Sequence, residues 1–373
     1  MLSNYLNTYL SKYKIHYGWV MAALVFITTM VSSSVSTVPQ IIILPITREF
    51  DWQISDVSNA IGLMYVVLAC FAPFASALML KIGVRNVVLT AATMNTCGLF
   101  LITQAAQRWH LLLSVGVLMG AAAGIIGVGL AATVATRWFV RRRGLVVGVL
   151  ASAFAAGQLL FVPLLAWLTT VVDWRYALVI PIIGSFFSAL LFLLFSKDWP
   201  YDLRLTPLGE KEMFTPPRHD GKNAFVTSLN VLFKSANEPA FWILASTFMI
   251  CGLSSTGIVG QHFIPFCADN NVGIVAASSY LAIMGIFNFI GTIGSGWLSD
   301  RYNNYHLLMW YYGLRALSLL YLPYSGFEFY TLILWAIFFG LDFIATVPPT
   351  VRLSSKHFGT VNGPILFGWI FAA

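Results

Sequence analysis

Residues 296–301 read Gly296-Trp297-Leu298-Ser299-Asp300-Arg301 and lie between two long apolar runs. A stretch in the corresponding place earlier in the chain, residues 76–85, reads Ser-Ala-Leu-Met-Leu-Lys-Ile-Gly-Val-Arg. A glycine four residues before an Asp-Arg pair lets two membrane helices approach closely while the charges stay in water. Because such a turn occurs twice, the sequence predicts two related helical bundles in a bilayer.

The composition excludes an ordinary soluble fold, because 58% of the residues are hydrophobic and only 9% are charged. A helix needs about 20 apolar residues to cross a hydrocarbon core of ~30 Å. The backbone must satisfy its own hydrogen bonds in lipid, so each apolar run is expected to be a helix. Ten runs are long enough to cross, near 18–44, 56–80, 86–106, 110–136, 145–171, 174–196, 240–267, 274–298, 305–323 and 328–350.

The order of these runs predicts how the chain is divided. Six spans form a first bundle at 17–196, and a polar stretch broken by prolines and Gly221 forms a cytoplasmic linker at 197–238. Residues 239–373 form a second bundle that is truncated, because the apolar residues at 362–373 are too few to cross. The predicted fold is thus all-α and integral to the membrane, with ten complete transmembrane helices and a partial eleventh.

The first 16 residues are expected to lie at the membrane interface. Their apolar and aromatic side chains recur at three- and four-residue spacing, which suits a short helix lying flat at headgroup depth. The residues of this stripe are Leu2, Tyr5, Leu6, Tyr9, Leu10 and Tyr13.

The basic residues give the orientation. Of the 21 Lys and Arg side chains, only Arg48, Arg108 and Arg175 fall on the side opposite the N-terminus, and Arg315 falls inside a span. Cytoplasmic loops carry an excess of Lys and Arg. The N-terminus is therefore predicted to be cytoplasmic, and the net charge of +7 follows from the topology rather than from nucleic-acid binding.

The sequence lacks the motifs that mark phosphate-binding, metal-binding and catalytic sites. No glycine-rich phosphate loop follows a strand, and the Cys and His residues show no metal-ligand spacing. Neither a metal nor a cofactor is therefore expected. None of the six histidines pairs with another at a spacing useful for catalysis, which argues against an enzyme. Any transport would be secondary, driven by a solute or ion gradient.

The six-linker-six layout and the repeated turn resemble the major facilitator superfamily of secondary transporters. The loop motif of that superfamily is Gly-x-x-x-Asp-Arg, followed by a glycine and basic residues. Gly296, Asp300 and Arg301 match its start, with Asn303 where glycine is usual. The resemblance implies that this loop rests against the fifth helix of the opposite bundle and helps to close the cytoplasmic side.

The first copy of the turn matches the motif less fully. Lys81, Gly83 and Arg85 match, but Ser76 and Leu80 replace the glycine and the acid. The resemblance implies that this copy rests against the eleventh helix, which is cut short here. Closure of the cytoplasmic side is therefore expected to depend mostly on Asp300.

Further stretches resemble the monocarboxylate and oxalate/formate-like branch of the bacterial facilitators. This resemblance implies alternating access in the cytoplasmic (inner) membrane of a bacterium and a small organic anion, a mono- or dicarboxylate, as the substrate. The stretches are Arg137-Trp138-Phe139 leading into Arg142-Arg143-Gly144, Ala156-Gly157-Gln158 with Pro163, and Gly340-Leu341-Asp342-Phe343 leading into Val347-Pro348-Pro349-Thr350.

Two charged residues fall deep inside predicted spans. Arg315 and Asp342 lie at similar depths, ~15 Å and ~12 Å at 1.5 Å per residue, on consecutive spans. Each charge costs roughly 2.5–3.5 kcal/mol at a helix centre and is a functional hypothesis by default. One interpretation is a salt bridge that only neutralises the pair. The other makes Asp342 a proton-coupling or substrate-site group, on a helix that lines the central cavity in the superfamily.

Other polar side chains fall on helices that line the cavity in the superfamily, and they are candidate substrate contacts. Serines there more often bond to their own backbone, whereas buried amides are costly unless they have a use. His262 lies near the outer mouth, where its ordinary pKa near 6.5 would suit a pH-sensitive gate. The candidates are Gln40, Tyr65, Gln158, Gln261, His262 and Asn288, beside Ser32, Ser33, Ser34, Ser36 and Thr37.

The sequence therefore favours a monomeric secondary transporter that works by alternating access as a symporter, antiporter or uniporter, with protons as a candidate coupling ion. The alternative is a shortened, transport-inactive relative or a membrane receptor. Uptake of substrate by the inserted protein separates the two.

Overall fold

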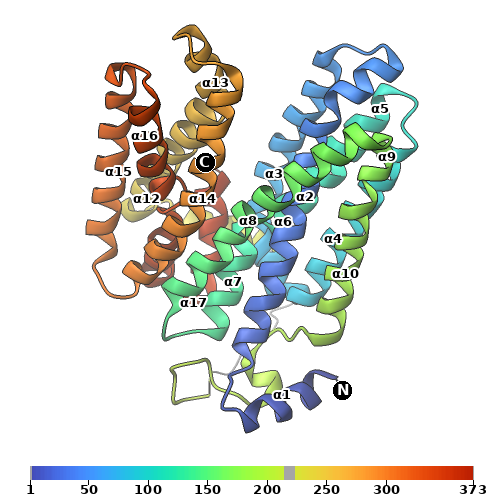
Figure 1. Ribbon diagram of the computed structural model, residues 1–373. Helices are drawn as coiled ribbons and strands as arrows, with labels where there is room; N and C mark the ends of the chain where they lie inside the picture. The colour runs from blue at the N-terminus through green and yellow to red at the C-terminus, as the bar shows by residue number, and fades with distance from the viewer. Residues whose placement is uncertain (1, 214–222, 373) are drawn as a thin grey trace.

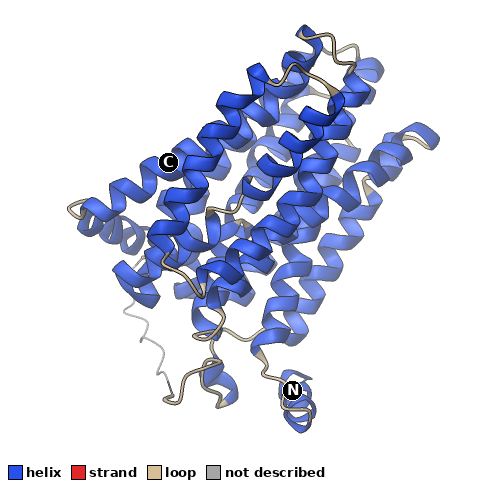
Figure 2. Cartoon of the chain, turned by 60° about the vertical axis from the view of Figure 1, so that its left-hand side comes forward, coloured by secondary structure: helices blue, strands red, loops and turns tan. Residues whose placement is uncertain are grey.

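The computed structural model describes residues 2–213 and 223–372 and is helical through most of both ranges (Figures 1 and 2). The linker prolines Pro216 and Pro217 and Gly221 lie outside the described residues. Within the described residues, Phe139 and Leu208 form one isolated parallel β-bridge. The prediction of an all-helical fold is confirmed.

The first set of helices precedes the linker and follows the short helix α1 (Leu2–Lys12). Leu6 and Leu10 of α1 pack on the core while Tyr5 and Tyr9 stay exposed, and the interfacial position of this helix stays a prediction. The elements after α1 are α2 (Gly18–Phe50), α3 (Ile54–Ile82), α4 (Val84–Thr103), α5 (Arg108–Leu111), η1 (Leu112–Met119), α6 (Gly120–Ile126), α7 (Val128–Trp138), α8 (Arg143–Val171), α9 (Trp174–Ala177) and α10 (Val179–Phe195).

The second set of helices follows the linker, which itself carries η2 (Pro200–Leu203) and α11 (Ala224–Ser235). Figure 1 shows this set beside the first, with the two sets crossing near α8 and α14 and diverging away from the end that carries α1. Its elements are α12 (Pro239–Gly252), η3 (Leu253–Val259), α13 (Gly260–Asp269), α14 (Ile274–Ser299), α15 (Asn304–Tyr321), η4 (Leu322–Tyr324), α16 (Phe329–Asp342) and α17 (Val347–Ala372).

Nine helical stretches in the described ranges are long and apolar enough to cross a membrane. The helix α15 is not among them, although the sequence predicts a span at 305–323. Its 18 residues include Arg315 and several polar aromatic side chains, which lower its hydropathy. The chain is an integral membrane protein, and the count of ten complete helices plus a partial eleventh stays a prediction, as do the bundle limits 17–196 and 239–373.

Two predicted spans differ from the helices found. The span at 328–350 is wrong as a single helix, because α16 ends at Asp342 and α17 begins at Val347. The span at 110–136 changes to a π-helix over Leu112–Met119 and bends again at Gly127. Beyond Gly359, whose φ is 84°, α17 folds back on itself: Ser354 Oγ donates a hydrogen bond of 2.8 Å to the Gly363 carbonyl.

Small residues set how closely the helices pack within the first bundle. A Cβ on Gly157 of α8 would overlap Ser33 Oγ and the Met30 carbonyl of α2. Helices that touch in this way gain van der Waals contact, which is what holds helices together in lipid. The glycine in the predicted Ala-Gly-Gln stretch is therefore a packing residue.

We expect Gly157→Ala to destabilise the fold by about 2 kcal/mol, because the added methyl overpacks the α2–α8 contact. Gly62→Ala on α3 is the matched control, since a Cβ there meets nothing within 4 Å and alanine favours a helix. The measurement is the thermal unfolding midpoint of both variants in detergent. A Gly157→Ala midpoint at or above that of the natural protein would contradict the packing role.

Candidate functional site

The two bundles touch most closely where α8 crosses α14. A Cβ on Gly144 would lie 2.6 Å from the Gly296 carbonyl oxygen, and one on Gly296 would lie 2.5 Å from the Gly144 carbonyl. One turn further on, a Cβ on Gly148 would lie 2.6 Å from the Thr292 carbonyl. The glycine of the repeated loop motif therefore allows backbone-to-backbone contact between the bundles.

Asp300 fastens this crossing by capping a helix of the other bundle. Its two carboxylate oxygens accept hydrogen bonds of 2.8 Å from the backbone N–H groups of Gly144 and Leu145, in the first turn of α8. The N–H groups of a first turn have no partner within their own helix, and the helix dipole favours an anion there. The predicted contact between the second loop and the fifth span is thus present in the structure.

Basic side chains complete the surroundings of Asp300. Arg352 of α17 forms an ion pair with the Asp300 carboxylate. Arg143, beside the capped turn, donates a hydrogen bond of 2.9 Å to the Phe139 carbonyl. Arg301 lies over the ring of Trp297 at 3.8 Å and not against the capped helix. Sequence reasoning missed Arg352, because nothing in its local motif marks it.

The first loop has a different arrangement. Gly83 has φ 87°, a conformation that favours glycine, and a Cβ there would overlap the Asp198 carboxylate. Asp198 accepts a hydrogen bond of 2.5 Å from the Val84 N–H, at the start of α4. Leu80 offers no acid to the opposite bundle, and Asp198, which follows α10, caps α4 within the first bundle. Lys81 and Arg85 are exposed.

Asp198 is held in place because the start of the linker packs under the first bundle. Leu208 N–H donates a hydrogen bond of 2.8 Å to the Trp138 carbonyl, and Val140 N–H donates one of 3.0 Å to the Leu208 carbonyl. His16 Nδ1 accepts from Gly18 N–H at 3.0 Å, which leaves Nε2–H to donate to the Thr206 carbonyl at 2.9 Å. Burial lowers the pKa of His16, so the imidazole favours this neutral form.

A second close crossing joins α3 to the returning arm of α17, residues 360–372. A Cβ on Gly368 would lie 2.7 Å from the Ala72 carbonyl oxygen and 3.0 Å from Pro73 Cα. This arm of α17 therefore reaches the helix that precedes the first loop. Nearby, Thr136 Oγ1 of α7 and Ser355 Oγ of α17 lie 3.5 Å apart and are buried.

Arg315 and Asp342 form the salt bridge that their depths allow. Arg315 Nε donates a hydrogen bond of 2.6 Å to Asp342 Oδ2, and the arginine is only 2% exposed. Arg315 Nη2 donates to the backbone carbonyls of Asp342 at 2.6 Å and Phe343 at 3.2 Å. Arg315 Nη1 reaches the Cys251 carbonyl at 3.4 Å and Ser254 Oγ at 3.3 Å. All five guanidinium N–H groups thus have partners.

The break between α16 and α17 explains why these carbonyls need a donor. The helix α16 ends at Asp342, so the carbonyls at its end lack the N–H partners that a continuing helix would give them, and lipid offers no substitute. Pro349 likewise has no N–H for the carbonyl of Ala345, four residues earlier. Side chains supply it instead: Ser295 Oγ donates to the Ala345 carbonyl at 2.5 Å, and Ser255 Oγ donates to the Phe343 carbonyl at 3.1 Å. Arg315 is therefore part of the support of a broken helix.

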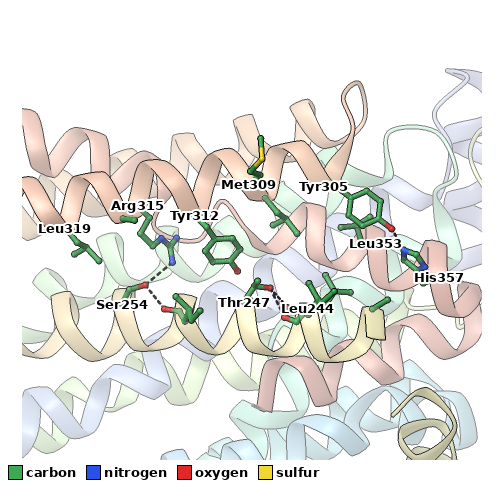
Figure 3. Close-up of a pocket in the computed structure, with 15 residues that line it drawn as sticks. Leu244, Thr247, Ser254, Tyr305, Met309, Tyr312, Arg315, Leu319, Leu353 and His357 are labelled. Atoms are coloured by element: carbon green, nitrogen blue, oxygen red, sulfur yellow. Dashed lines mark hydrogen bonds between the residues drawn. The ribbon is translucent and has the colours of Figure 1, made fainter. Parts of the chain in front are cut away.

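Arg315 also borders an apolar cavity of about 750 Å³ between α12 and α15. Figure 3 shows Arg315 and Tyr312 on α15, with Arg315 bonded to Ser254 on the opposite wall. Leu353 and His357 of α17 close one end, where His357 contacts Tyr305. All of its walls belong to the second set of helices, so the cavity does not lie between the bundles.

The remaining predicted contacts fall in different surroundings. Gln40, Gln158 and Tyr65 are exposed on α2, α8 and α3, Tyr65 by 44%. Asn288 is buried, and its Oδ1 accepts a hydrogen bond of 3.1 Å from Thr292 Oγ1.

The two remaining candidates, Gln261 and His262, lie on α13 in the second set of helices. His262 is exposed and lines a small apolar cavity with Leu319 and Leu322, within the second set of helices. Gln261 lies in α13, and its side chain is outside the described part. The hydroxyl groups of the first span bond to carbonyls three or four residues earlier in their own helix, at Ser33, Ser34, Ser36 and Thr37.

Comparison with known families matches residues 9–373 to the Major Facilitator Superfamily. The chain belongs to this superfamily. Two solved structures share the fold: the proton:xylose symporter XylE, with a TM-score of 0.67 at 13% identity over 95% of this chain and 86% of that one, and the *E. coli* fucose:proton symporter FucP, with a TM-score of 0.66 at 15% identity over 94% and 88%.

Among curated relatives, mouse monocarboxylate transporter 11 is 26% identical over 300 residues, which cover 76% of this chain and 60% of that protein. Rat monocarboxylate transporter 13 is 25% identical over 92% of this chain and 76% of its own length. The *Escherichia coli* MFS-type transporter YhjX is 25% identical over 87% and 77%. The predicted resemblance to monocarboxylate transporters is confirmed, and the chain spans about 60% of the first of these relatives.

We expect Asp300→Ala to loosen the crossing of α8 and α14 by about 2–3 kcal/mol, because two charge-assisted hydrogen bonds and an ion pair are lost. The measurement is the maleimide labelling rate of a Thr136→Cys reporter, with the exposed Cys70 and Cys97 replaced by serine. Asp198→Ala is the matched control: it removes a carboxylate cap within one bundle, so it should lower the melting temperature without raising the labelling rate. Equal rates for Asp300→Ala and its parent would contradict the assignment.

Proposed function

We propose that the chain is a secondary transporter that moves a small organic anion by alternating access across the inner membrane of a bacterium, with its N-terminus in the cytoplasm. The observation that carries this proposal is the inter-bundle closure at one end. Gly144 and Gly296 bring the backbones together, Asp300 caps α8, and the bundles diverge toward the other end (Figure 1). In this interpretation the structure is closed on the cytoplasmic side and open to the outside.

The organic-anion class is supported by the relatives that are named monocarboxylate transporters. We propose Gln40, Tyr65 and Gln158 as neutral hydrogen-bond donors to the substrate, because they are polar, exposed side chains on membrane spans. Arg315 is a poor candidate for that contact, since each of its donors already has a protein partner. The Oδ1 of Asn288 already accepts a hydrogen bond from Thr292.

Proton coupling has a candidate in Asp342. Its Oδ2 accepts from Arg315, whereas its Oδ1 is buried and has no hydrogen-bond partner among the described residues. A buried carboxylate oxygen without a partner is costly, and a proton on it would lower that cost. Because the same residue ends α16, a change in its protonation would act directly on the broken helix.

We expect Asp342→Asn to retain exchange of substrate for substrate but to lose the pH dependence of net uptake, because the amide cannot take up or release a proton. Asn288→Ala is a control: it also changes a buried polar residue of the second bundle but removes no titratable group. Net uptake and counterflow are measured at several external pH values in proteoliposomes. An unchanged pH dependence in Asp342→Asn would rule out this residue as the coupling group.

We expect the purified chain in proteoliposomes to take up and exchange at least one member of a panel of mono- and dicarboxylates. Counterflow detects carriers whatever their coupling ion, because it needs only alternating access. A folded, inserted protein that showed no uptake or counterflow with any carboxylate would favour the other candidate, a transport-inactive relative or receptor. The observation that favours a transport-inactive relative or receptor is that every donor of Arg315 is bonded within the protein, which leaves none for a substrate anion.

A further inference from the structure

The linker helix α11 contacts both bundles through one buried hydroxyl group. Ser228 is fully buried, and its Oγ donates a hydrogen bond of 2.8 Å to the Pro73 carbonyl of α3. The same oxygen accepts a hydrogen bond of 3.0 Å from Trp369 Nε1 of α17. Because α3 and α17 belong to different bundles, Ser228 connects three segments that are far apart in the sequence.

Aromatic rings surround this connection. Phe225 of α11 stacks on Phe74 of α3, with ring centroids 4.4 Å apart and planes at 15°. Trp369 meets the ring of Phe74 edge-on, with centroids 5.5 Å apart. Rings in these arrangements attract one another beyond the area they bury. The three rings therefore join α11, α3 and α17 in one cluster.

The cluster lies directly on the second inter-bundle crossing. Gly368, next to Trp369, is where the α17 backbone approaches Ala72 and Pro73. The neighbouring side chain of Ile365 packs with Ala77 of α3 and Ala224 of α11 in a small buried core. The linker helix thus covers the place where α3 and α17 touch.

Hydroxyl groups of the first span, in α2, behave differently. Ser34 and Thr37 donate to carbonyls three residues earlier in their own helix, which is the usual arrangement in an apolar span. Ser228 instead uses its donor on one bundle and its acceptor on the other. If α3 and α17 separate, one of the two bonds must break and leave a buried polar group without a partner.

We propose that α11 is a clasp on the closed cytoplasmic side, with Ser228 as its positioning residue. The clasp holds α3 against α17 and must release one of them before this side can open. The inference rests on the proposed alternating access and adds to it a role for the linker. It also gives the α3–α17 crossing a fastening of its own, separate from the Asp300 cap on α8.

The test is the maleimide labelling rate of the Thr136→Cys reporter in detergent, with Cys70 and Cys97 replaced by serine. Ser228→Ala removes both hydrogen bonds at nearly constant volume, and we expect it to raise the labelling rate about tenfold. Phe225→Ala, whose ring is half exposed and can be removed without unfolding the core, is a second variant and should raise the rate in the same direction. Thr227→Ala, which loses only a bond to the Asn223 carbonyl of its own helix turn, is the matched control and should leave the rate unchanged.

Unchanged labelling in both Ser228→Ala and Phe225→Ala would overturn the clasp. An equal rise in the labelling rate of Thr227→Ala would also overturn the clasp, because any change that weakens α11 would then raise the rate, whether or not it removes the Ser228 contacts. Labelling needs no substrate, so a protein that showed no uptake but responded to Ser228→Ala would contradict the proposed function and keep the clasp. Normal uptake, together with an unchanged labelling rate in Ser228→Ala and Phe225→Ala, would support the proposed function and overturn the clasp.

Discussion

Backbone-to-backbone contact between helices of different bundles is the constraint on which the rest of this structure depends. It occurs at two places that the internal repeat relates, α8 on α14 and α3 on α17, and each relies on glycine. Lipid gives no hydrophobic force between helices, so this contact and the polar groups beside it must hold the closed end together. Asp300 serves one crossing and Ser228 serves the other. The two loops that look alike in sequence therefore make different contacts. The second joins the bundles, whereas the helix that follows the first is capped by Asp198 inside its own bundle.

The same need to satisfy polar groups in lipid accounts for the charged pair in the second bundle. The helix breaks after Asp342, and Arg315, Ser255 and Ser295 donate hydrogen bonds to the carbonyls at the break. A charge that would be costly alone is thus held by five hydrogen bonds. This arrangement makes Arg315 a structural residue and leaves Asp342 Oδ1 as the group without a partner.

Much of the fold was predictable because its signals are local. Apolar run length gives the spans, the Gly-x-x-x-Asp-Arg motif marks the crossing at Gly296 and Asp300, and the similar depths of Arg315 and Asp342 anticipate their pairing. Other features depend on contacts between distant segments and carry no local signal. Asp198 caps α4 beside the first loop from more than a hundred positions away, and Ser228 bonds to Trp369, which lies 141 positions later in the chain. For the substrate contacts, the sequence identified polar residues on membrane spans. The structure was needed to show that the Oδ1 of one of them, Asn288, accepts a hydrogen bond from Thr292.

The central claim is that transport requires the closed end to open. Thr136 and Ser355 face each other across the two bundles with their hydroxyl oxygens 3.5 Å apart, so cysteines at both positions place two thiols within reach of each other. The most direct measurement is substrate counterflow in proteoliposomes by this double-cysteine protein, before and after reduction. The account predicts that the oxidised protein is inactive and that reduction restores exchange. Full activity with the disulfide verified intact would contradict it.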